Sequence, residues 1–329
     1  MEALSSQTTA TATEIHNNMA NQLSLAGFET PNTAGDSGPG LYRRKSDHLS
    51  SGKCARTAVP AESAPGEPEA TPLVSVFTLG RFSLLLNGMP AVFGRKAPRR
   101  PLELLKAIIA LGGRDISTAS LMSALWPDVD GDTAQRSFDT TLHRLRKILG
   151  DDRVLILMDG KLTLDGRYCW VDVWSFERLL GQTHRLLTSD VSGKQVYHLA
   201  QLSRNLTGLY QDHFLSNENV TSWSVSMHER LRNKYIHHLL EIGRYMERHG
   251  CWDQAIHCYR KGTDVDDLVE VFYQRLMHCY LQTRRFSEGL AAYRRCRQVL
   301  SISLGLQPEP ETESLYQSLR NSRLNRQSA

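Results

Sequence analysis

The chain has 329 residues, of which 40% are hydrophobic, and its formal net charge is +4. This length leaves room for about two domains, and the apolar content is sufficient for buried cores. The mildly basic balance permits nucleic-acid binding but excludes the extreme charge of a histone-like protein. Function must therefore be inferred from motifs rather than from bulk properties.

The sequence predicts neither a signal peptide nor a transmembrane helix. The N-terminus has no apolar stretch of the kind that a signal peptide requires, and no window holds 18 uninterrupted apolar residues. The six cysteines include no CxxC pair, which favours reduced thiols. We expect a soluble, cytoplasmic protein with no membrane partner.

Metal binding and catalysis are both disfavoured. A group of cysteines and histidines suggests zinc at first sight: Cys251, His257, Cys258, His278 and Cys279. Their spacing fits no usual zinc finger, and they fall on helical patterns that require small core residues. The sequence also lacks the GxxxxGK[ST], HExxH, GxSxG and GxGxxG motifs, and no nucleophile, base and orienting group form a set. We expect neither an enzyme nor a cofactor.

Residues 1–72 are rich in Ser, Thr, Ala, Asn, Pro and Gly, with few large apolar side chains. Such a segment cannot bury enough surface to offset its ordering entropy. We expect it to be disordered.

The pattern changes at Leu73, where short apolar runs begin. Residues 74–80, 81–86 and 89–92 are expected to form strands, and Asn87-Gly88 between the last two is a strong hairpin signal. The sequence therefore predicts a small antiparallel sheet at this point.

Three helices and a second hairpin are expected next. The first two helices are predicted over 101–111 and 118–126, the second capped by Ser117. The third is predicted over 132–149, capped by Asp132 with Gln135 three residues later, and it ends at Gly150. A hairpin over 153–165 then turns at Asp159-Gly160. Helices closed by a β-hairpin describe a winged helix-turn-helix, which we assign to residues 73–166.

From Trp170 onward the pattern is helical almost throughout, with segments expected around 174–180, 195–206, 222–248, 251–261, 268–281 and 287–300. Trp252 and Phe286 stand 34 positions apart, as do three further pairs. These pairs are Ala255 with Gly289, Tyr259 with Tyr293, and Ile242 with Leu276. This period is that of tetratricopeptide repeats, so we expect residues 167–329 to form an all-α, tetratricopeptide-like domain. An unrelated helical bundle is the alternative.

The third helix has two contrasting faces. At about 100° per residue, Phe138, Leu142, Leu145 and Leu149 fall within about 60° of one another, so this apolar stripe faces the core. The opposite face is cationic and hydrogen-bonding, and it carries Thr133, Arg136, Thr140, His143, Arg144 and Lys147.

Such a face suits the major groove of DNA. We expect Arg136, Thr140 and His143 to contact base edges, and Arg144 and Lys147 to contact the backbone. A polar helix face on its own is more often a solvated surface. Here the preceding helix and the following hairpin, which carries Lys161 beside its turn, favour DNA binding instead. A second cationic cluster precedes the first helix, at Arg95, Lys96, Arg99 and Arg100, and taken alone it is a solvated loop.

The loop 127–132 is acidic. We expect Asp132 to cap the helix and Asp128 and Asp130 to be free to face a partner.

Several of these segments resemble a known family. LGRF at 79–82, LLKAIIALGG at 104–113, ALWPD at 124–128 and LHRLRKILG at 142–150 resemble the OmpR-type winged helix. CWVDVWSFERLL at 169–180 and GLQPEPETESLYQSL at 305–319 resemble the bacterial transcriptional activator domain. The pairing is typical of the Streptomyces antibiotic regulatory protein family.

The resemblance implies a sequence-specific transcription activator associated with the nucleoid. Its partners would be double-stranded DNA, often in tandem direct repeats, and RNA polymerase, which the loop 127–132 would contact; the helical domain would support a homodimer or higher oligomer. Two alternatives stay open. The same DNA-binding body could repress, or the chain could be an adaptor whose helical domain binds a protein while the winged helix does not touch DNA.

Overall fold

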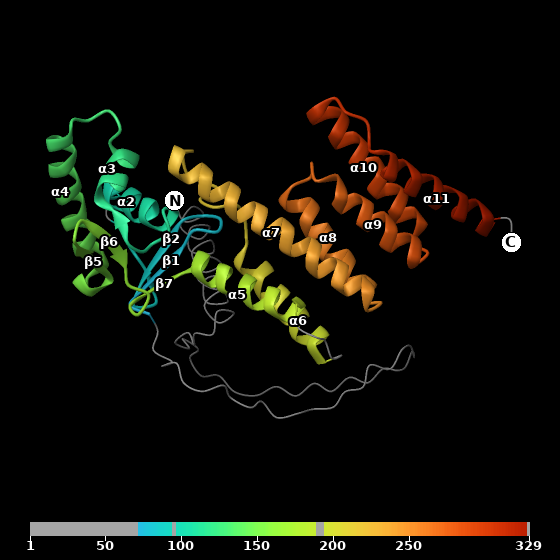
Figure 1. Ribbon diagram of the computed structural model, residues 1–329, viewed down its shortest axis with the longest axis horizontal. Coiled ribbons are helices and arrows are strands. Elements are labelled where there is room, and N and C mark those ends of the chain that lie inside the picture. The colour runs from blue at the N-terminus through green and yellow to red at the C-terminus, as the bar shows by residue number, and fades with distance from the viewer. Residues whose placement is uncertain (1–71, 94–96, 189–193, 328–329) are drawn as a thin grey trace, which may run out of the picture.

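The computed structural model describes residues 72–93, 97–188 and 194–327. The segment 1–72 that we expected to be disordered lies outside the described residues except for Pro72, and so do Arg95 and Lys96 of the second cationic cluster. The described chain is mainly helical with small sheets, as the sequence predicted (Figure 1).

The first sheet has four strands in the order β3-β2-β1-β7. The strands are β1 (Val74–Phe77), β2 (Ser83–Leu86), β3 (Met89–Pro90) and β7 (Cys169–Val171). β1 pairs antiparallel with β2, and Asn87 and Gly88 form the turn to β3 with φ of 50° and 77°. β7 pairs parallel with β1, Val74 opposite Cys169. We had expected residues from Trp170 onward to be helical; this strand is a correction, because the chain returns to the first sheet before the helices begin.

The next elements form a second, smaller sheet and the helices that pack around it. They are α2 (Arg99–Ala110), β4 (Ile116–Ser117), α3 (Thr118–Leu125), α4 (Gly131–Leu149), a 3-10 helix (Asp152–Val154), β5 (Leu155–Met158) and β6 (Lys161–Leu164). The strand order is β4-β6-β5. Asp159 and Gly160 turn the β5–β6 hairpin with φ of 51° and 69°, the left-handed values that a two-residue hairpin loop requires.

The expected cap of α4 was misplaced by two residues. Asp130, not Asp132, is the N-cap, because its backbone is extended and its Oδ1 accepts a hydrogen bond from the Thr133 N–H at 3.3 Å. Asp132 lies in the first turn, where its charge still favours the helix dipole. Acids alternate at 128, 130 and 132, so only the backbone angles decide which one caps.

The remaining elements are helices: α5 (Asp172–Thr188), α6 (Lys194–Leu209), α7 (Ser222–Arg248), α8 (Trp252–Val265), α9 (Glu270–Gln282), α10 (Phe286–Leu304) and α11 (Pro310–Gln327). From α7 to α11 each helix packs on the next (Figure 1). The sequence analysis did not predict α11, whose side chains are mostly polar.

Positions 34 residues apart have matching places in this array. Trp252 and Phe286 each begin a helix, and the small residues Ala255 and Gly289 are both buried one turn later. A Cβ at Gly289 would lie 2.7 Å from Leu319 Cδ2, so the small residue allows α10 and α11 to approach closely.

The two halves of the chain are joined through the first sheet. The buried Asp172 carboxylate accepts hydrogen bonds from the Thr78 N–H at 2.5 Å, the Leu79 N–H at 2.7 Å and the Thr78 hydroxyl at 2.8 Å. Leu79 also forms an isolated antiparallel β-bridge with Phe214. One continuous cluster of buried hydrophobic side chains runs from β1 to α9. The helical half is therefore fixed against the sheet rather than tethered loosely to it.

Candidate nucleic-acid interface

The cationic side of α4 is open. α4 lies at the end of the molecule away from α8–α11 (Figure 1), and it packs against α2, α3 and the 3-10 helix. The predicted apolar stripe is buried, with Phe138 and Leu145 fully inaccessible. All six predicted side chains of the opposite face are exposed: Thr133, Arg136, Thr140, His143, Arg144 and Lys147.

Both ends of α4 are fixed. The Thr133 hydroxyl and backbone N–H hold the pKa of the Asp130 carboxyl below its ordinary value, so this cap stays ionised near neutral pH. At the other end, Gly150 has φ of 77° and its N–H donates to the Arg146 carbonyl at 3.0 Å. A capped helix presents its side chains on a rigid support, which favours specific recognition.

One cationic side chain of this helix has a structural role. Arg146 is half-buried, and its Nη2 donates to the Leu155 carbonyl at 3.2 Å. It therefore ties α4 to the hairpin, while Arg144 and Lys147 on either side of it stay exposed.

A cationic cleft adjoins the C-terminal half of α4. The sequence analysis did not predict that the cations before the first helix lie next to those of α4. Arg99 and Arg100, at the start of α2, line this cleft of about 1010 Å³ together with Arg144 and Lys147. Among the residues that the structure describes, no acidic side chain lines it, although Arg100 pairs with Glu103 at 3.0 Å. We had expected Arg99 and Arg100 to belong to a second cationic cluster before the first helix, one that taken alone is solvated loop charge. In the structure they begin α2 and line one hollow with Arg144 and Lys147 of α4.

The hairpin positions Lys161 at its turn. Lys161 is exposed and stands opposite Ser117 of β4 in the strand register, and the Gly160 carbonyl accepts from the Thr118 N–H at 2.9 Å. The turn is thus held beside the start of α3. Lys161 is the only cation between 155 and 164.

The acidic loop is exposed from 127 to 130. Asp128 is exposed, whereas Asp130 uses one oxygen to cap α4. Within the described ranges, no group of three metal-ligating side chains is gathered that could hold an ion, and no helix there is long and apolar enough to cross a membrane.

An exposed basic helix beside a helical domain is the arrangement that the sequence analysis expected of a transcriptional regulator. Comparison with known proteins gives the type. Residues 171–320 match the model of the bacterial transcriptional activator domain. This part of the chain therefore resembles the bacterial transcriptional activator domain, which is the resemblance that the sequence analysis stated for it.

Curated relatives agree with this assignment. Regulatory protein AfsR of Streptomyces coelicolor is 25% identical over 267 residues, which cover 79% of this chain and 26% of AfsR. Transcriptional regulatory protein EmbR of Mycobacterium tuberculosis is 23% identical over 257 residues, which cover 73% of this chain and 62% of EmbR. The match thus spans about a quarter of AfsR and less than two thirds of EmbR.

A solved structure shares the fold. The structure of Mycobacterium tuberculosis EmbR in complex with a low affinity phosphopeptide aligns with a TM-score of 0.57 at 18% identity. The alignment covers 78% of this chain and 69% of that one. At this identity the likeness concerns the fold alone.

Proposed function

We propose that the protein is a sequence-specific DNA-binding transcription activator. Residues 73–166 serve as a winged helix-turn-helix of the OmpR type, and residues 167–329 as a tetratricopeptide-like activator domain. The observation that carries the proposal is the exposed cationic face of α4, which is not covered by the helical half of the same chain.

The side chains of this face have different roles. In the major groove, Arg136, Thr140 and His143 lie on the early part of the exposed face and contact base edges, with Arg136 suited to guanine. Thr133 contacts a phosphate near the start of the helix, and Arg144 and Lys147 contact the backbone further along it.

Backbone contacts extend on both sides of α4. The cleft that Arg99 and Arg100 share with Arg144 and Lys147 accepts a phosphate of the flanking DNA, because four cations converge there without a lining acid. On the hairpin, Lys161 contacts the backbone or the minor groove.

Activation follows from contact with RNA polymerase through the loop 127–132, with Asp128 as the available charge and Asp130 contributing its outer oxygen. The chain acts in the cytoplasm, associated with the nucleoid, as a homodimer or higher oligomer that places recognition helices in successive major grooves. Repression by the same body would use the same DNA contacts without this polymerase contact.

A gel-shift series on DNA fragments selected from the source genome tests these roles. Arg136→Ala should cost roughly 1–3 kcal/mol and relax sequence preference, whereas Lys147→Ala should weaken specific and random duplexes about equally. Both side chains are exposed, so neither change should unfold the protein. Identical behaviour of the two variants would refute the division between base and backbone contacts.

The adaptor hypothesis would gain support if the helical domain covered the face of α4. The six side chains are exposed instead, so this structure gives the hypothesis no support.

A further inference from the structure

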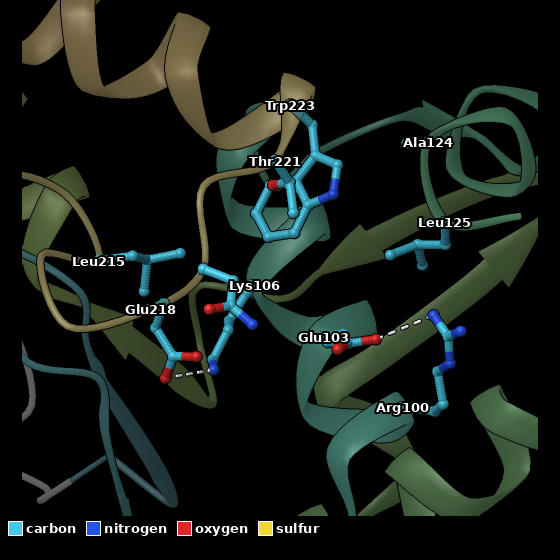
Figure 2. Close-up of a pocket in the computed structure, with 10 residues that line it drawn as sticks. Arg100, Glu103, Lys106, Ala124, Leu125, Leu215, Glu218, Thr221 and Trp223 are labelled. Atoms are coloured by element: carbon cyan, nitrogen blue, oxygen red, sulfur yellow. Dashed lines mark hydrogen bonds and ion pairs between the residues drawn. The ribbon is translucent and has the colours of Figure 1, made fainter. Parts of the chain in front are cut away.

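The hollow between the two halves of the chain offers a ligand little to bind. Figure 2 shows it between α2, the end of α3 and the start of α7, beside Trp223, and its volume is about 170 Å³. Its two cations are already paired, since Lys106 Nζ lies 2.6 Å from a Glu218 oxygen and Arg100 pairs with Glu103 at 3.0 Å. A ligand there would have to break one of these pairs to gain a charge contact.

A larger cavity lies within the helical half, between α6 and α8 at the end of α7. Its volume is about 510 Å³, and small-molecule sites usually measure about 300–1,000 Å³. On both α6 and α8 the lining side chains recur every three or four residues, so each helix turns one face to the cavity. The lining consists of Tyr197, Ala200, Ser203, Arg204 and Thr207 of α6, Met246 of α7, and Asp253, Gln254, His257 and Cys258 of α8.

The buried part of this lining is apolar. Met246 and Cys258 are 1% and 5% exposed. Burial raises the pKa of the Cys258 thiol to about 11, so the thiol stays protonated and uncharged near neutral pH. The Thr207 hydroxyl is already used, because it donates to the Ser203 carbonyl at 2.9 Å and accepts from the Tyr235 hydroxyl at 3.1 Å. The floor of the cavity therefore favours the uncharged, apolar body of a ligand.

The rim of the cavity carries a positive charge that is available to a ligand. Arg204 is exposed, and its Nη2 donates to the side-chain oxygen of Gln201 at 2.6 Å, which uses one of the five N–H donors of the guanidinium. The one acid in the described lining, Asp253, pairs instead with Arg285 at 3.2 Å. Arg204 is therefore placed to bind an anion, and a carboxylate matches the planar geometry of its donors.

Rings stand at the rim on both helices. Tyr197 of α6 is 74% exposed, whereas the neighbouring tyrosines in the chain, Tyr210 and Tyr235, are buried. One exposed tyrosine is ordinary on a surface, but at the mouth of a cavity with an apolar floor its ring offers a stacking face. His257 of α8 is also exposed, and its ring nitrogens can hydrogen-bond to a ligand. These rings favour a ligand whose body is planar.

We propose that the cavity between α6 and α8 is a binding site for a small molecule with a planar apolar body and one carboxylate. The body lies on the floor formed by Met246 and Cys258 and against the ring of Tyr197, and the carboxylate accepts hydrogen bonds from Arg204. The lining residues belong to the helical half alone. The inference therefore goes beyond the proposed function and does not depend on DNA binding.

The probe for this site is 2-naphthylacetate, titrated into the full chain and followed by ligand-observed NMR. The uncharged 2-naphthylacetamide has nearly the same shape and serves as the matched ligand. We expect 2-naphthylacetate to bind with a dissociation constant of about 1 mM or below. The amide should bind at least about five-fold more weakly, because it lacks the charge that Arg204 would meet.

The charge contact is tested with Arg204→Gln. This variant should weaken 2-naphthylacetate at least about five-fold and leave the amide within about two-fold. Arg294→Gln is the matched control, since Arg294 is also exposed, donates to its own helix at the Leu290 carbonyl, and does not line the cavity. It should bind both probes as the wild type does.

The apolar part of the site is tested with two further variants. Ala200→Leu fills space that a small side chain leaves open and should weaken both probes at least about ten-fold. Tyr197→Ala changes an exposed side chain and should weaken both probes about two- to five-fold. If Ala200→Leu does not fold, the Tyr197→Ala result decides.

Three results would overturn the proposal. The first is that neither probe binds the wild type at concentrations up to about 10 mM. The second is that the two probes bind equally, or that Arg204→Gln binds 2-naphthylacetate as tightly as Arg294→Gln does. The third is that binding survives the changes at Ala200 and Tyr197, which would place the probe elsewhere on the protein.

Discussion

His238 should make the protein sensitive to mild acid. The side chain lies on α7, is 4% exposed, and stacks on Tyr235 with ring centres 6.4 Å apart. Its Nε2 has no hydrogen-bond partner among the described residues. Burial, assisted by the neighbouring His237, lowers the pKa of His238 from 6.5 to about 4.

The sign and size of the effect follow from this pKa. The folded protein keeps His238 neutral while the unfolded chain takes up a proton at its ordinary pKa, so the stability contributed by the neutral ring is complete above about pH 6.5 and is lost as the pH falls toward 4. At about 1.36 kcal/mol per pKa unit the full loss is about 3 kcal/mol, of which about 2 kcal/mol is gone at about pH 5.

Urea unfolding at about pH 7.5 and pH 5 measures this loss. Other groups titrate in the same interval, so the test is the difference between the wild type and His238→Phe, which keeps an aromatic ring and cannot be charged. The variant should lose about 2 kcal/mol less than the wild type over this interval. His198→Phe, at an exposed position of α6, should behave as the wild type. Parallel pH profiles for the wild type and His238→Phe would refute the reasoning.

Three further results are expected. Gly243→Ala should destabilise the protein by about 1–3 kcal/mol, because the new Cβ would collide with a buried tyrosine ring. Gly181→Ala, on an open helix face, should instead stabilise the protein by about 0.5–1 kcal/mol. Thermal melts that rank the two variants in the reverse order would contradict the packing. Glu218→Gln should lower the free energy of unfolding in urea by about 1–3 kcal/mol, since it leaves the nearly buried Lys106 ammonium without its partner. Adding Lys106→Met to this variant should recover most of the lost stability. If Glu218→Gln alone leaves stability unchanged, the role of this pair is contradicted. Arg99→Ala should reduce the slope of log affinity against log salt by about 0.9 in DNA titrations, and an unchanged slope removes the cleft from the interface.

The local elements were largely predictable because their signals are local. Asn87-Gly88 and Asp159-Gly160 mark two-residue turns whose left-handed backbone few other residues adopt easily. The spacing of Phe138 and its partners fixed the buried side of α4, and with it the exposed side. The 34-residue offset between Trp252 and Phe286 predicted equivalent places for these two residues, and they begin α8 and α10.

The long-range features were not predictable in this way. β7 is a strand only because it pairs with β1, far away in the chain, and nothing in its three residues specifies that partner. The cleft between Arg99 and Arg144 depends on how α2 crosses α4. The pocket beside Trp223 depends on how the activator domain packs against α3. Each of these is a property of packing between segments, which periodicity does not record.

The most direct test of the central proposal is the affinity of the full chain for duplex DNA, measured by titration at rising salt with a genome-selected fragment and a scrambled fragment of equal length. We predict tighter binding to the selected fragment, a steep decline with salt for both, and loss of the preference when Arg136 and Thr140 are both replaced by alanine. Equal binding of the two fragments, or no binding even at low salt, would contradict the account.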